Sequence, residues 1–174
     1  PSFGQNIRII DNTIAGGVYG IYYSVTGSTN KATGTVVSGN QLSEVGYRGV
    51  YLNNHSNPQI TGNVLQTSST EDQISLFAEN ISDGLLIRQN RVVSVRGNAL
   101  RLVNIAGTVT TSNLVYNNFL YSEGPNRAIY LSNTNYLSFY HNAVWNRSGG
   151  AALEYASSGG NNRLVNNIFQ SETG

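Results

Sequence analysis

The strongest constraint on the fold is an asparagine that recurs about every 26 residues, which is the sequence pattern of a repeat protein. Seven copies follow one another at intervals of 23 to 28 residues, namely Asn12, Asn40, Asn63, Asn90, Asn118, Asn142 and Asn167. Apolar residues lie three positions before and two positions after every copy. Each of the first six copies is also followed by a short alternating run, as in Ala128-Ile129-Tyr130-Leu131. One structural unit is therefore repeated from end to end.

Each repeat contains three short runs with a period of two, rich in β-branched and aromatic residues and separated by Gly, Asn, Ser and Asp. No run has the spacing of an amphipathic helix. One coil of three short strands cannot bury its inward side chains alone, but coils stacked at about 4.8 Å pair each strand with its counterparts above and below. The sequence therefore predicts an all-β solenoid, a parallel β-helix of about six to seven coils, forming a single domain over residues 1–174.

The repeated asparagines need a separate explanation, because a buried polar side chain without partners costs a few kcal/mol. Asparagines stacked in register can donate a hydrogen bond from each amide to the carbonyl of the next, forming a ladder. The alternative is that asparagine simply tolerates a left-handed turn conformation. We expect the ladder, because turn tolerance alone would also allow Gly or Asp at some of the seven positions.

These motifs resemble the right-handed parallel β-helix repeats of the pectate-lyase-like superfamily. The resemblance rests on the anchors Asn12-Thr13-Ile14, Asn63-Val64-Leu65 and Asn167-Ile168-Phe169 and on the alternating strands that follow the anchors. It implies a right-handed coil and a substrate groove on an outward sheet face. It does not imply one activity, since the superfamily includes lyases, hydrolases, epimerases, adhesins and tailspike-like proteins.

Charge and composition limit which partners, cofactors and locations are expected for this chain. The chain has 11% charged residues, a net charge of +1 and a single lysine, Lys31, so it lacks the basic field that attracts phosphate backbones, and we expect no nucleic acid partner. No apolar run approaches the roughly 18 residues of a membrane span. The absence of cysteine excludes disulfides and thiolate zinc sites. Abundant Asn, Gly, Ser, Thr and Tyr favour a secreted or cell-surface location.

The two ends of the predicted stack show no polar cap. The first coil starts within a few residues of Pro1 and the last stops soon after Phe169. Because unpaired strand edges invite association, we expect either flanking sequence or end-to-end contact between copies.

One column of outward side chains is the candidate binding site. In the strand that follows each anchor, the residue between the two apolar positions points outward, because side chains alternate. Aligning six repeats predicts a substrate-binding column made of Tyr22, Tyr51, Ser75, Arg101, Tyr130 and Glu154. Tyrosine rings cover the apolar faces of sugars and arginine holds carboxylates. The alternatives are tyrosines that only stabilise the sheet and a surface for self-association.

Catalysis has weaker support in the sequence. Arg101 with Glu123 or Glu154 is the best catalytic set, with arginine as the base of a lyase or the carboxylates acting as in a glycosidase. No metal-ligand motif is present; calcium would need clustered acids, and Glu71-Asp72 is the only adjacent acid pair. We expect His55 and His141 to be structural hydrogen-bonding residues.

The function expected from the sequence is binding of an extracellular or cell-surface polysaccharide along this column, as a module or as part of a larger carbohydrate-active enzyme. One alternative is a polysaccharide lyase or glycoside hydrolase in its own right. The other is a stiff structural spacer of a surface adhesin.

Overall fold

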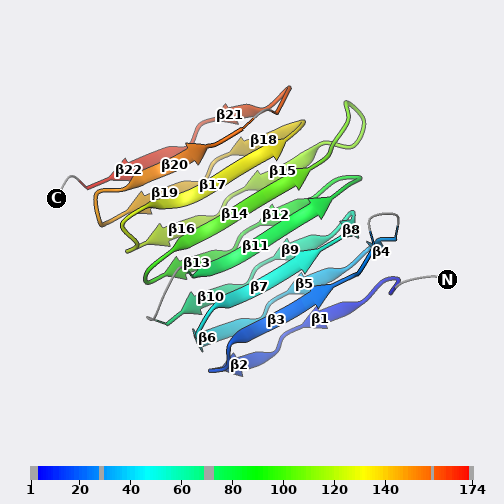
Figure 1. Cartoon of the computed structure of the whole chain (residues 1–174), viewed down its shortest axis with the longest axis horizontal. Coiled ribbons are helices and arrows are strands. Elements are labelled where there is room, and N and C mark those ends of the chain that lie inside the picture. Colours follow the sequence, from blue (N-terminus) through cyan, green and yellow to red (C-terminus); the bar gives the residue numbers. More distant parts are fainter. Residues whose placement is uncertain (1–3, 28–29, 69–72, 158, 173–174) are drawn as a thin grey trace.

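The protein is a solenoid of stacked coils built from β-strands (Figure 1). A computed structural model describes residues 4–27, 30–68, 73–157 and 159–172, and no helix occurs in these ranges. Three parallel sheets run along the stack, with seven, seven and six strands, and β4 (Ala32–Thr33) pairs with β8 (His55–Ser56) beside them. The predicted all-β coil architecture with three strands per coil is confirmed.

The first sheet precedes the repeated asparagines in each coil. Its strands are β1 (Arg8–Ile10), β5 (Val36–Ser38), β9 (Gln59–Thr61), β12 (Leu86–Arg88), β15 (Asn113–Tyr116), β18 (Leu137–Tyr140) and β21 (Arg163–Val165).

The second sheet follows the asparagines. Its strands are β2 (Thr13–Ala15), β6 (Gln41–Val45), β10 (Val64–Thr67), β13 (Arg91–Ser94), β16 (Phe119–Ser122), β19 (Ala143–Asn146) and β22 (Ile168–Ser171).

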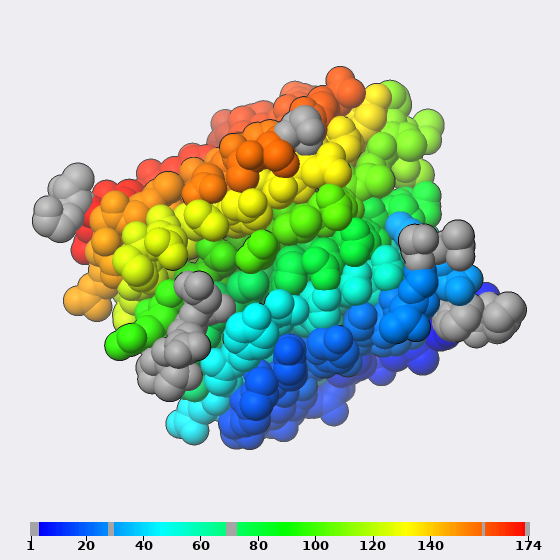
Figure 2. Space-filling model, viewed as in Figure 1, coloured from blue at the N-terminus to red at the C-terminus, as the bar shows by residue number. Residues whose placement is uncertain are grey.

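The third sheet lies nearest the viewer in Figure 1 and completes each coil. Its strands are β3 (Tyr19–Ser24), β7 (Arg48–Asn53), β11 (Ile74–Ile81), β14 (Asn98–Ile105), β17 (Arg127–Thr134) and β20 (Ala151–Tyr155). Figure 2 shows the coils on this face as successive diagonal bands that follow the order of the chain.

The core is a column of apolar side chains stacked like on like. Ile9 pairs with Val37, Val37 with Ile60, and the same register continues through the last coil to Leu164. The residues two positions after the asparagines form a second column, which begins at Ile14. In the middle coils these side chains are fully buried, so the apolar column is continuous through the solenoid.

The repeated asparagines form the predicted ladder. At each of its six rungs the side-chain Nδ2 donates to the Oδ1 of the next asparagine at 2.9 to 3.0 Å. The backbone N–H of the same residue donates to the same Oδ1 at 2.9 to 3.0 Å. Asn90 also donates from Nδ2 to the backbone oxygens of Ile60 and Arg88, at 2.9 and 3.0 Å. The ladder therefore satisfies polar groups at the inside of the turn.

The left-handed backbone conformation does occur in this turn, but at the residue before each ladder asparagine. The residue preceding each anchor has a positive φ of 54 to 66°. These residues are Asp11, Gly39, Gly62, Gln89, Asn117, His141 and Asn166. The turn-tolerance explanation therefore applies to them, whereas the anchors are held by their hydrogen bonds.

No helix in the described ranges is long and apolar enough to cross a membrane.

Candidate functional site

The candidate site is the outward face of the third sheet. Its central column consists of side chains that the strand register places at one level in successive coils. The column is Tyr22, Tyr51, Phe77, Arg101, Tyr130 and Glu154. Five of the six residues predicted for the column therefore lie in it.

The prediction that Ser75 belongs to this column is wrong, and Phe77 occupies its place. The connection from Asn63 to the first core residue of β11, Leu76, is longer than in neighbouring coils, which shifts the strand by two residues. Ser75 is fully buried and its Oγ bonds to Thr67 Oγ1 at 2.9 Å and to the backbone oxygen of Val93 at 2.8 Å. Ser75 is therefore a structural residue that joins the second and third sheets.

The aromatic part of the column is covered by arginine and is not an open ladder of rings. Tyr22 is 56% exposed, whereas Tyr51 and Phe77 are only 6% and 4% exposed. The Arg48 guanidinium carbon lies 4.5 Å from the ring centroid of Tyr51 and 4.8 Å from that of Phe77. Arg48 Nη2 also donates to the hydroxyl of Tyr47 at 3.2 Å. These contacts hold the guanidinium over the rings, so its position is set before any ligand arrives.

Two more arginines continue the row toward the C-terminal coils. Arg101 stacks on Phe77 and Tyr130, with its guanidinium carbon 5.3 and 4.9 Å from the two ring centroids. Arg127 lies 4.6 Å from the centroid of Tyr130 and forms a salt bridge with Glu154 at 2.7 Å. Within the described part of the chain, neither Arg48 nor Arg101 has a salt bridge. The row therefore has cationic groups that remain available to an anion.

A small hollow of about 80 Å³ lies between the last two arginines. Gln73, Asn98, Arg101, Asn126 and Arg127 contribute to its walls. The Nε atoms of Arg101 and Arg127 and the Oε1 of Gln73 are buried, and no described group bonds to them. Unpaired buried polar atoms are costly, so two donors and one acceptor make this part of the face polar.

The other carboxylate on this face, Glu79, is already engaged. It accepts a hydrogen bond from the Tyr51 hydroxyl. Burial, together with that bond and the charge of Glu79, raises the pKa of Tyr51 well above its usual range. Tyr51 therefore stays protonated and keeps its hydrogen bond to Glu79.

The predicted catalytic residues are not brought together. Glu154 pairs with Arg127, although it shares the column with Arg101. Glu123 follows the second sheet, where its Oε1 accepts from Tyr121 at 2.9 Å and lies 3.6 Å from Arg147. The catalytic roles of Arg101, Glu123 and Glu154 stay predictions.

Clustered metal ligands do not occur in the described part of the chain. No group of three or more His, Asp or Glu in residues 4–27, 30–68, 73–157 and 159–172 could hold a metal ion. The acid pair Glu71-Asp72 lies outside the described residues. A calcium site stays untested.

His55 has the structural role expected from the sequence. It is fully buried, and its ring nitrogens bond to Thr35 Oγ1 at 3.0 Å and to the backbone oxygen of Tyr23 at 3.1 Å. Burial lowers the pKa of His55, so the imidazole is neutral in the folded protein at neutral pH.

Arg48 and Asn98 are candidate site residues that the sequence pattern does not predict. Strict alternation from the core residue Val50 would point Arg48 inward. Regular pairing of β7 with β11 is interrupted between Ile74–Arg48 and Leu76–Val50. Alternation therefore breaks at Gly49, and the Arg48 side chain lies on the outward face, over Tyr51 and Phe77. The available signal is a polar or aromatic residue two positions before the first core residue of the strand, as at Tyr19, Arg48, Asn98 and Arg127.

One comparison with known proteins gives a match. A family model described as a right handed beta helix region matches residues 2–171. No curated protein and no solved structure matches the chain significantly. The architecture supports a carbohydrate-related or a structural role and is consistent with the pectate-lyase-like superfamily. Because the family model covers nearly the whole chain and the fold is a parallel β-solenoid, this protein belongs to the right-handed β-helix family.

Proposed function

We propose that the outward face of the third sheet binds an acidic polysaccharide, a linear polyuronate, in an extended conformation. The observation that supports this is the row of Arg48, Arg101 and Arg127, held on aromatic rings, of which only Arg127 forms a salt bridge within the described residues. Successive coils are about 4.8 Å apart, close to the length of one sugar unit in an extended chain. Neighbouring sugar units can thus meet equivalent positions on successive coils.

Each type of group in the row has a defined part in binding. Guanidinium groups form paired, charge-assisted hydrogen bonds with carboxylates. Tyr22, which is 56% exposed, offers ring surface to the apolar face of a sugar. Because the arginines are already ordered by stacking, less conformational entropy is lost when the ligand binds.

The direct test is calorimetric titration with an oligogalacturonide and with a neutral gluco-oligosaccharide of the same length. Arg101→Gln should weaken binding of the acidic chain by about tenfold or more, the loss of one charge-assisted contact. Arg91→Gln is the matched control, because Arg91 packs over Phe119 on the second sheet, outside the row. Equal losses in both variants, or equal affinity for the neutral chain, would contradict the proposal.

The same titration separates binding from turnover. If the protein cleaves the oligogalacturonide by β-elimination, an unsaturated product accumulates and absorbs ultraviolet light. Hydrolysis gives no such absorbance but creates new reducing ends, so constant absorbance together with a constant number of reducing ends supports a binding role.

A further inference from the structure

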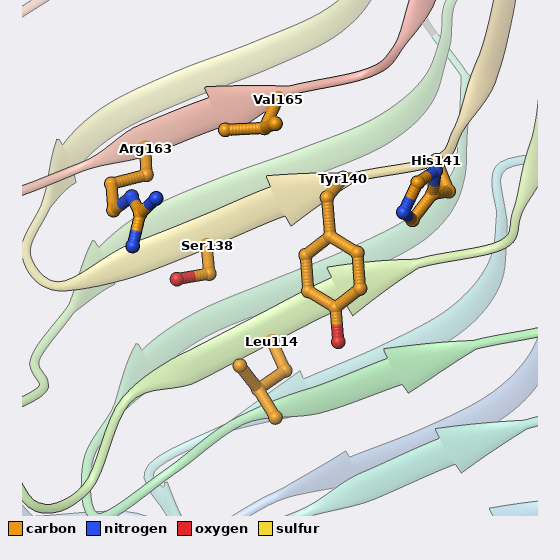
Figure 3. A pocket seen from close by; sticks show the side chains of 6 residues that line it. All are labelled: Leu114, Ser138, Tyr140, His141, Arg163 and Val165. Carbon is orange, nitrogen blue, oxygen red and sulfur yellow. The ribbon is translucent and has the colours of Figure 1, made fainter.

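A second hollow lies on the outward face of the first sheet, away from the arginine row. It has a volume of about 290 Å³ and is lined by Leu114 of β15, Ser138 and Tyr140 of β18, the adjoining His141, and Arg163 and Val165 of β21 (Figure 3). Ligand sites in proteins usually start at about 300 Å³, so this hollow suits one sugar unit better than a longer chain segment.

Tyr140 gives the hollow an aromatic surface. One face of its ring stacks on Tyr116, with the centroids 4.9 Å apart and the planes 6° from parallel. In the next coil the register places the short side chain of Val165 beside Tyr140, and the ring of His141 packs against Tyr140 edge-to-face, with the centroids 5.5 Å apart. Figure 3 shows the Tyr140 ring lying face-on between Ser138 and His141. A partly exposed ring that its neighbours hold in place is suited to contact with the apolar face of a pyranose.

Arg163 supplies the charge. It is exposed and pairs in the strand register with Ser138, which lies two residues before Tyr140 in β18. None of the six lining residues is an acid, and no salt bridge of Arg163 occurs in the described ranges. An anionic group in the hollow would therefore meet a cation without competition from a lining carboxylate.

The remaining polar groups suit sugar hydroxyls. The hydroxyl of Ser138 both donates and accepts hydrogen bonds, and the imidazole of exposed His141 does the same when neutral. Leu114 and Val165 add apolar surface beside the tyrosine ring. The hollow thus combines an aromatic ring, one cation, two side chains that can bond to sugar hydroxyls, and apolar surface.

We propose that this hollow is a second carbohydrate site, which holds one hexuronate unit with its ring on Tyr140 and its carboxylate on Arg163. It shares no residue with the arginine row, so it does not depend on the function proposed for the third sheet. A polysaccharide with uronate branches could engage both faces.

The test is a titration of the protein with methyl glucuronide, followed by nuclear magnetic resonance. Wild-type protein should show saturable shifts in the residues around the hollow. Arg163→Gln and Tyr140→Ala should each weaken binding by at least about tenfold. Arg163→Lys keeps the charge but loses the paired hydrogen bonds of the guanidinium, so its affinity should lie between that of these two variants and that of the wild type.

Two controls keep this site separate from the row on the third sheet. Arg88→Gln removes a guanidinium from the same sheet face, where Arg88 Nη1 bonds to the Tyr116 hydroxyl at 3.2 Å, and should leave methyl glucuronide binding unchanged. Arg101→Gln should also leave it unchanged while weakening oligogalacturonide binding. If Arg163→Gln has no effect, or if Arg88→Gln weakens binding equally, the site is refuted. Displacement by acetate as effective as by methyl glucuronide would reduce it to a simple anion site and refute the sugar assignment.

Discussion

Removing one asparagine from the middle of the ladder should destabilise the whole solenoid. Asn90 is 2% exposed, and its Oδ1 accepts from both the backbone N–H and the Nδ2 of Asn63, each at 2.9 Å. Its own Nδ2 donates to Ile60, Arg88 and Asn118. Asn90→Ala therefore removes the two N–H donors that these three acceptors share and an oxygen that accepts two hydrogen bonds, all within one buried turn.

The magnitude follows from the groups left without partners. The backbone N–H of Asn63 loses its only acceptor in the described structure, and Asn63 itself is fully buried. An unsatisfied buried group costs about 1–3 kcal/mol, and the weakened amide of Asn63 and the freed carbonyl groups bring the total to about 3 kcal/mol. For a chain of this size that corresponds to a fall of about 6–12 °C in melting temperature.

The assay is thermal unfolding followed by circular dichroism or calorimetry. Asn126→Ala is the matched control, because Asn126 is exposed and, in the described ranges, has neither a positive φ nor a side-chain hydrogen bond. Asn104 is less suitable, because it has a φ of 53° and its Nδ2 donates to Asn80 Oδ1 at 3.0 Å in a second, surface ladder. Asn90→Asp should be at least as damaging as Asn90→Ala, since it loses the donors and buries a charge. The reasoning fails if Asn90→Ala melts no lower than Asn126→Ala.

Three further outcomes are expected. Because burial holds the pKa of His55 below its ordinary value of 6.5, the unfolded chain binds more protons below that pH, and denaturant midpoints should fall as the pH drops from 6.5 to 5. His55→Gln should flatten this slope; an unchanged slope would exclude His55 as its cause. Phe77→Ala should lower the free energy of unfolding by about 3 kcal/mol, because Phe77 is 4% exposed and lies under Arg48 and Arg101. Tyr22→Ala, at a 56% exposed site, should lower it much less. Equal losses in the two variants would contradict the packing. Gly97→Ala should destabilise the protein strongly, because the added Cβ would lie 1.9 Å from the backbone oxygen of Gln73. Gly46→Ala, whose Cβ would have its nearest contact at 3.4 Å, should melt close to the wild-type temperature. Similar melting temperatures for the two variants would refute the close approach at Gly97.

The repeat makes most of the fold predictable from the sequence. Asparagine anchors at a regular interval fix where each coil turns, and the apolar residues around them fix the register of the first two sheets. Aligning the repeats accordingly predicts that Arg101 and Tyr130 lie side by side in one column, and the structure confirms that placement.

The third sheet is harder to predict because it lies farther from the anchors. A longer connection before β11 shifts the register, so the repeat pattern predicts Ser75 where Phe77 lies. The turn of the strand at Gly49 also hides Arg48, since alternation holds only while a strand is regular. Predicting such residues requires knowing the length and path of each connection, which depend on packing between coils and not on local sequence.

The hydrogen-bond ladder also gives the solenoid a direction. Each asparagine side chain donates to the Oδ1 of the next asparagine and accepts from the preceding one, so the ladder itself has a donor end and an acceptor end. A further coil can continue the ladder only if it has the same orientation as the others. Removing a whole repeat, such as residues 64–90, would join two matching surfaces, whereas removing half a coil would place a turn against a strand. The chain should therefore tolerate changes in length in units of one repeat.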